Sequence, residues 1–168
     1  MTNRLRWMLA CWFFLFCTQI EAGVTRFDSA YFFQSEEALK EKQVDFKDLA
    51  RYSRQVQSAA WKVLKEAKLA PNKGYIVLAV RSDQEIAVWF DMDVTLHEYY
   101  VYEINEAVKK IRPFHIDKGI VVFALKMSIE TAQHTQKPFP APVEWKAAKL
   151  KLADPEDIEQ LVLSIWPE

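Results

Sequence analysis

The sequence of 168 residues contains little cysteine and little glycine, and each shortage excludes a kind of function. Its two cysteines, Cys11 and Cys17, lie in an apolar N-terminal stretch, so the remaining chain has no disulfide, thiolate nucleophile or cysteine metal site. Three glycines in the whole chain are too few for a glycine-rich loop that cradles phosphate groups. Gly-x-Ser-x-Gly and His-Glu-x-x-His motifs are also absent. The sequence therefore predicts a fold that is stabilised by its packed core.

An excess of charge of one sign is missing as well. The chain has 22 Lys and Arg against 23 Asp and Glu, a net charge of −1. A nearly neutral balance gives no electrostatic reason to expect a nucleic acid or an anionic membrane as the partner.

The N-terminal residues 1–22 have the pattern of a secretory signal peptide. Arg4 and Arg6 precede an apolar run over 7–17, and the segment ends in the small residue Ala22. The run is shorter than the roughly 20 residues that a membrane-spanning helix needs. We expect cleavage after Ala22 and no stable membrane insertion afterwards. Because the remaining chain has no structural cysteines, we expect the compartment to be the bacterial periplasm. An uncleaved anchor is the alternative.

Two stretches of the remaining chain have a helical pattern. In residues 45–69, apolar side chains recur at spacings of three and four, which predicts an amphipathic helix. Its stripe consists of Leu49, Tyr52, Val56, Ala60, Val63 and Ala67. Thr95 and Glu98 form a Thr-x-x-Glu capping box in front of a second helical pattern, which ends before Pro113.

Three runs predict strands of one sheet. Residues 74–80 and 85–90 flank a short polar stretch and predict a hairpin. The third run, 119–127, is almost continuously apolar, which favours a strand in the middle of a sheet or covered on both faces. NKGYIVLAV (72–80) and DKGIVVFAL (117–125) resemble each other, but only the first is followed by a hairpin. We interpret them as two helix exits into buried strands, not as a repeat or as phosphate-binding turns.

The two ends are less regular. The aromatic run over 26–33 packs on the core or forms an exposed sticky surface, and Ser35 caps a short helical turn after it. Near the other end, the proline-rich stretch 137–145 is predicted to be extended, and KAAKLKL (146–152) to be a candidate last strand. Asp154 and Pro155 predict the start of a final helix.

Together these patterns predict a single α+β domain over residues 23–168. Its core, 45–127, has an antiparallel sheet of three strands, or four, packed against two main helices in the order α-β-β-α-β. A proline-rich connection and a C-terminal helix follow over 137–166.

The one cluster of titratable residues worth testing for chemistry is DMDVTLHE (91–98). Its members Asp91, Asp93 and His97 are residue types that bind zinc or a harder cation, as a small metal-dependent enzyme would require. Their spacing does not place all three on one helical face, and aspartates before a helix are common because they suit its dipole. We therefore predict no metal, no cofactor and no catalytic residue.

The order of the predicted helices and strands, and several stretches of the sequence, resemble the C-terminal domain of the TonB and TolA energy-transducing proteins. LARYSRQVQSAAWKVL resembles the opening helix, GYIVLAVRSDQEIAVWF the hairpin, LHEYYVYEINEAVKKIRPF the second helix, and GIVVFALKM the last strand. The resemblance covers residues 50–127. It implies a compact α+β module whose partner pairs with an exposed strand edge, for which 119–127 is the first candidate.

The sequence therefore predicts a non-catalytic periplasmic module that binds a protein partner, as an adaptor in an envelope complex does, and that is a monomer or a weak dimer. An immunity protein that neutralises a periplasm-acting toxin is the alternative, and a metal-dependent enzyme is the third. Exposed tryptophans are the usual anchors of protein interfaces. The candidate partner-binding residues are Ile120, Val122, Ala124, Trp89 and Trp145.

Overall fold

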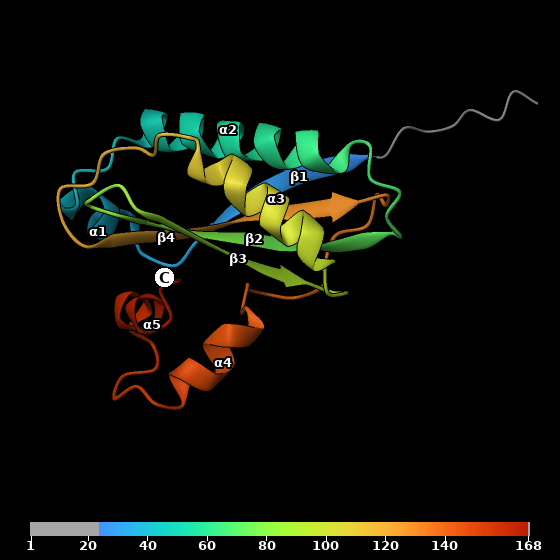
Figure 1. Ribbon diagram of the computed structural model, residues 1–168. Helices are drawn as coiled ribbons and strands as arrows, with labels where there is room; N and C mark the ends of the chain where they lie inside the picture. The colour runs from blue at the N-terminus through green and yellow to red at the C-terminus, as the bar shows by residue number, and fades with distance from the viewer. Residues whose placement is uncertain (1–23, 168) are drawn as a thin grey trace, which may run out of the picture.

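The computed structural model describes residues 24–167, and the predicted signal peptide lies outside them. The described chain forms an antiparallel sheet with the strand order β1-β4-β2-β3 (Figure 1). The strands are β1 (Thr25–Phe32), β2 (Asn72–Arg81), β3 (Ile86–Met92) and β4 (Ile120–Ile129). The predicted α+β class is confirmed, and the sheet has four strands.

Helices cover both faces of this sheet. They are α1 (Glu36–Glu41), α2 (Phe46–Leu64), α3 (Glu98–Lys109), α4 (Val143–Lys149) and α5 (Ile158–Ser164). Figure 1 shows α2 and α3 above the sheet and α4 and α5 below it. The predicted sheet with two helices is thus completed by a third layer that the C-terminal segment supplies. Between residues 24 and 167, no helix is both long enough and apolar enough to cross a bilayer.

The larger core lies between the sheet and α2 and α3. Leu49, Tyr52, Val56 and Ala60 of the predicted stripe are buried on α2, while Val63 is only partly buried and Ala67 lies beyond the helix. The buried members pack against alternate side chains of the strands, because successive residues of a strand point to opposite faces. The members from α2, β2 and β4 include Leu49, Tyr52, Val56, Ala60, Leu64, Ile76, Leu78, Val80, Val121, Phe123 and Leu125. Burying each large apolar side chain of this kind contributes about 1.5–3 kcal/mol. This core holds α2 and α3 in place beside each other.

A second core lies on the opposite face of the sheet, beneath α4 and α5. Its members include Val77, Ala79, Trp89, Val122, Ala124, Trp145, Leu161 and Val162. Since both faces of β2 and β4 are covered, both strands need apolar side chains at odd and even positions. The continuous apolar runs of 74–80 and 119–127 have this cause.

The aromatic run near the N-terminus forms β1, a strand that the sequence did not predict. Phe27 packs against the larger core and Phe33 against the second one. Tyr31 and Phe32 remain 38% and 39% exposed. The run is thus partly packed on the core and partly exposed.

The C-terminal segment differs from its prediction in two ways. Residues 146–152, a candidate strand, belong largely to helix α4, in which Trp145 and Ala148 lie three residues apart and are both buried. Alanine and lysine are good helix formers, so the local propensity agrees with the helix. The last helix begins at Ile158, and Asp157 caps it by accepting two backbone N–H groups. Asp154 and Pro155 precede that start.

We expect Tyr52→Phe to raise the free energy of unfolding by about 1 kcal/mol, because the buried Tyr52 hydroxyl has no hydrogen-bond partner among the described residues. Burial also raises the pKa of Tyr52 above its ordinary value near 10. The unfolded chain then loses this proton above about pH 10 while the folded chain keeps it, so the wild type loses stability as the pH rises further. Urea unfolding at neutral and at alkaline pH measures both effects.

The variant should show a weaker loss between the two pH values than the wild type. Tyr102→Phe is the matched control, because Tyr102 is 61% exposed. A less stable Tyr52→Phe protein, or an unchanged alkaline loss, would contradict the buried, unpartnered hydroxyl.

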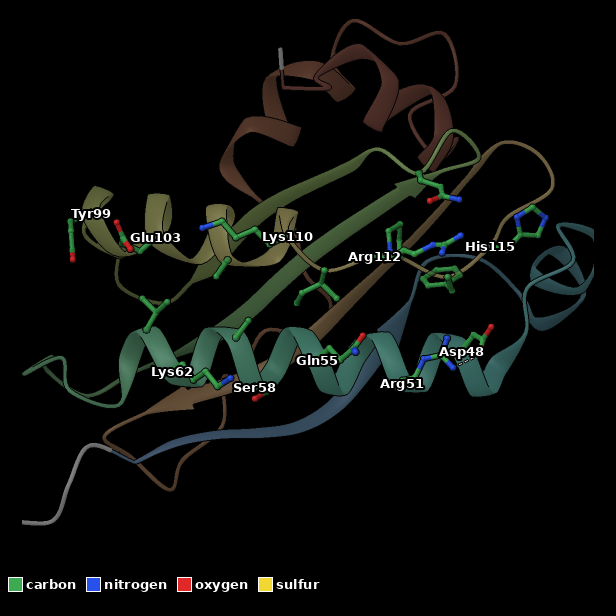
Figure 2. Close-up of a pocket in the computed structure, with 17 residues that line it drawn as sticks. Asp48, Arg51, Gln55, Ser58, Lys62, Tyr99, Glu103, Lys110, Arg112 and His115 are labelled. Atoms are coloured by element: carbon green, nitrogen blue, oxygen red, sulfur yellow. Dashed lines mark ion pairs between the residues drawn. The ribbon is translucent and has the colours of Figure 1, made fainter.

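A groove separates the outward sides of α2 and α3. It has a volume of about 1150 Å³, and the loop over 111–115 also lines it. Figure 2 shows its labelled side chains arriving from α2 on one wall and from α3 and this loop on the other.

Candidate functional site

Strand β4, which contains the predicted edge 119–127, lies in the middle of the sheet. It pairs with β2 along one side and with β1 along the other. The prediction that this strand forms an exposed edge is therefore wrong, because β1 returns from the N-terminal side of the chain to cover it.

Side chains complete this cover where β1 ends. The Gln34 amide donates to the carbonyl of Ile120 at 2.7 Å and accepts the N–H of Val122 at 2.9 Å. The Glu159 carboxylate accepts the N–H of Ile120 at 3.1 Å, and the Phe33 N–H bonds the Val122 carbonyl at 3.3 Å. The backbone groups of this end of β4 are thus occupied within the chain itself.

The five candidate partner-binding residues belong to the second core. Ile120, Val122, Ala124, Trp89 and Trp145 are all exposed by 6% or less. The indole of Trp145 lies against Trp89, with ring centroids 5.8 Å apart, and against Phe33 at 5.2 Å. A partner does not reach these side chains in this fold, so the two tryptophans act as core residues. For Ile120, Val122 and Ala124, the almost continuous apolar run of 119–127 was the signal in the sequence that these side chains are buried.

The strand order leaves β1 and β3 as the two outer strands of the described sheet. The pairing of β1 shifts register between Phe27 and Ala30, which marks a bulge. Bulges protect a sheet edge because they bend the strand and interrupt its row of backbone groups. The pairing of β3 with β2 is regular from Met92 to Ile86. Strand β3 therefore offers the more regular outer edge.

The direction of the backbone groups in β3 follows from its hydrogen-bonding pattern. Bonds from the N–H of Arg81 to the carbonyl of Glu85 (3.0 Å) and from the N–H of Asp93 to the carbonyl of Lys73 (2.8 Å) lie at the two ends of the β2–β3 pairing. Antiparallel pairs alternate between bonded and non-bonded ones, so Ala87, Trp89 and Asp91 also bond to β2.

The N–H and C=O groups of Val88 and Phe90 consequently point away from β2, toward the outer side. Among the described strands, β3 pairs only with β2, so within residues 24–167 no backbone hydrogen bond engages these four groups. The spacing of these groups along β3 matches the spacing of N–H and C=O groups in an adjacent strand. A strand paired at this edge would therefore satisfy all four groups.

A shallow groove of about 210 Å³ runs along this edge. Val88, Phe90 and Met92 of β3 lie along it, with Leu96 and Val101 on the α3 side and Val143 and Glu144 on the α4 side. Val143 is 70% exposed. The edge thus has apolar side chains on both sides of its unpaired backbone groups.

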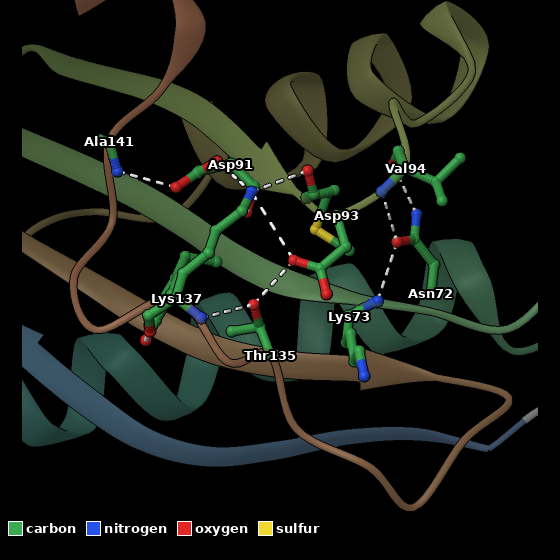
Figure 3. A network of polar contacts seen from close by, with 10 residues as sticks. Asn72, Lys73, Asp91, Asp93, Val94, Thr135, Lys137 and Ala141 are labelled. Carbon is green, nitrogen blue, oxygen red and sulfur yellow. Dashed lines mark hydrogen bonds and ion pairs between the residues drawn. The ribbon is translucent and has the colours of Figure 1, made fainter.

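A polar network holds the proline-rich connection against the C-terminal end of β3 (Figure 3). The Asp91 carboxylate accepts from the Lys137 ammonium at 2.5 Å and from the N–H of Ala141 at 2.7 Å. Lys137 also donates to the carbonyl of Met92 at 3.0 Å, and Asp93 accepts from the Thr135 hydroxyl at 2.7 Å. The network fills the end of the edge beyond Phe90 and leaves Val88 and Phe90 unpaired.

Tyr75 adds to this network from the adjacent strand. Its hydroxyl donates to the carbonyl of Lys137 at 3.1 Å. Burial, followed by the charge of Asp91, raises the pKa of Tyr75, because both disfavour the negatively charged phenolate. The tyrosine therefore stays a neutral donor at physiological pH.

The residues of the metal-site hypothesis serve other interactions. Asp91 and Asp93 belong to the network, while His97 caps α3 by accepting the N–H of Tyr99 on Nδ1 at 3.2 Å. Helix α3 begins at Glu98, so the predicted Thr95 cap is wrong. Across the described residues, no three His, Cys, Asp or Glu side chains gather where they could hold a metal ion.

Comparison with known proteins finds no matching family model, no matching curated protein and no matching solved structure.

Proposed function

We propose that this chain is a non-catalytic protein-binding module of the bacterial periplasm, which binds an extended segment of a protein partner along the outer edge of β3. The observation that carries the proposal is the row of unpaired N–H and C=O groups at Val88 and Phe90. The periplasmic location rests on the signal-peptide pattern of residues 1–22.

Addition of a strand to a sheet edge combines two sources of affinity. The partner's backbone pairs with the two N–H and two C=O groups, and its alternate side chains enter the spaces on either side of the strand. Here the groove lined by Leu96, Val101 and Val143 receives apolar side chains. We therefore expect the partner segment to be extended, free of proline at its pairing positions, and apolar at alternate residues. This is the mode of binding that the resemblance to the TonB and TolA domain implies, moved to a different strand.

Val88→Pro tests the proposal directly. Proline removes the outward N–H of Val88 and leaves the β2–β3 pairing intact, since that N–H takes no part in it. Val88→Ala is the matched control, because it removes side-chain atoms from the same position and keeps the N–H. Proteins captured from a periplasmic extract by the wild type are identified, purified, and measured by calorimetry against all three forms. We expect Val88→Pro to weaken binding at least about tenfold and Val88→Ala to weaken it only slightly.

Hydrogen exchange gives a second readout on the wild type. The amides of Val88 and Phe90 should exchange rapidly in the free protein and become protected by the partner. A partner that binds folded Val88→Pro and wild type equally, or that leaves these amides unprotected, would refute the β3 edge as the site. Protection that appears without a partner, as the protein concentration rises, would instead identify a second copy as the occupant.

A further inference from the structure

The groove between α2 and α3 carries basic side chains that its own acidic residues do not neutralise. Lys62, Lys110 and Arg112 line it and form no ion pair among residues 24–167. Arg51 also lines it and is paired with Asp48 at 2.9 Å. Figure 2 shows that these cations come from both walls, with Arg112 and Lys110 opposite the helix that carries Arg51 and Lys62.

Apolar and aromatic groups lie between these cations. The lining includes Ala59, Val63, Ala107, Ile111, Pro113 and Phe114. Phe114 is buried at 3% exposure, and Val63 and Ile111 pack against the larger core. The groove therefore combines an apolar base with basic rims.

We propose that this groove is a second binding site, separate from the β3 edge, for an acidic amphipathic segment of a protein partner. Charge complementarity favours carboxylates facing Lys62, Lys110 and Arg112, while the apolar base favours hydrophobic side chains on the opposite side of the segment. An amphipathic helix that lies in a groove between two helices has this arrangement.

The same features disfavour a nucleic acid as the occupant. Two carboxylates, Asp48 and Glu103, also line the groove, and they would repel a uniformly anionic backbone. The whole chain has a net charge of −1, so the basic side chains are a local feature and not part of a basic protein. A peptide can place its neutral residues near these acids.

The test uses a short fluorescent peptide of repeating Glu-Glu-Leu-Leu units as the probe. Its binding to the chain of residues 23–168 is followed by fluorescence anisotropy at low salt. The double variant Lys110→Glu/Arg112→Glu should weaken binding at least about tenfold, because two attractive charges become repulsive. Lys146→Glu/Lys151→Glu makes the same change of net charge at exposed positions on or after α4, on the other side of the sheet, and should leave binding nearly unchanged.

Further arms separate the alternatives. The same repeat with lysine in place of glutamate should not bind, and Val88→Pro should bind the acidic probe as the wild type does, because the two sites are independent. Circular dichroism confirms that each variant is folded. Absence of probe binding, or equal weakening by both double variants, would overturn the proposal. A single-stranded DNA oligonucleotide that binds more tightly than the peptide, and loses binding with Lys110→Glu/Arg112→Glu, would overturn it in favour of a nucleic-acid site.

Discussion

Trp145→Ala is expected to lower the free energy of unfolding by about 3–5 kcal/mol. Trp145 is 2% exposed and lies between Trp89 and Phe33, so its removal leaves a large cavity between α4 and the sheet. The surrounding groups cannot fill that space, since Trp89 belongs to a strand held by β2. Urea unfolding followed by circular dichroism measures the change.

Trp61→Ala is the matched control for this prediction. Trp61 is 43% exposed on α2, and the Lys65 ammonium lies 5.5 Å from the centroid of its ring. Its loss should cost less than about 1 kcal/mol. If Trp145 were an exposed anchor for a partner, as the sequence suggested, Trp145→Ala would change stability no more than Trp61→Ala does. Equal effects of the two substitutions would therefore refute the second core.

Gly74→Ala is expected to destabilise the fold by about 3 kcal/mol, which would leave a marginal domain partly unfolded. A Cβ atom at Gly74 would overlap the carbonyl oxygen of Asp91 and lie 2.5 Å from the Cα of Met92. Both are backbone atoms of β3, so no side-chain rotation relieves the overlap. Strand β2 cannot move away, because β4 holds it on its other side. Thermal and urea unfolding measure the loss.

Gly119→Ala provides the comparison within the same sheet. Gly119 has φ +72°, a left-handed conformation that costs an alanine about 1–2 kcal/mol. The nearest atoms to its added Cβ are the ends of the Glu159 and Lys42 side chains, each 2.6 Å away, and these can move. We expect a smaller loss than for Gly74→Ala. If Gly119→Ala instead lost more stability than Gly74→Ala, the close approach of β2 and β3 at Gly74 would not be what forbids a side chain there.

These two glycines show what the similarity of NKGYIVLAV and DKGIVVFAL means. Both stretches enter buried strands, as predicted, and β2 and β4 are neighbours in one sheet. The glycines serve different purposes, however, since Gly74 permits a close strand approach and Gly119 a left-handed turn. A local pattern indicates that glycine is needed there, but the reason depends on atoms elsewhere in the chain.

The candidate binding surfaces depend on such distant contacts even more strongly. Strand β1 was not predicted, although its phenylalanines and tyrosine favour a strand. Because β1 pairs with β4, nearly a hundred residues later, the outer edge is found at β3 instead of β4. Arg51 and Arg112 were each present in the sequence, but only the packing of α2 beside α3 and its loop places them around one groove.

The sequence by itself determined the α+β class, the helix within 45–69, the hairpin and the buried strand within 119–127. Each of these depends on the periodicity of apolar residues over a few turns or a few strand positions, which is a local property. Only the tertiary structure decided which strand has unpaired backbone groups, which tryptophans are buried and which cations share a groove. Those properties arise from pairing and packing between segments far apart in the chain, and local propensity carries little information about them.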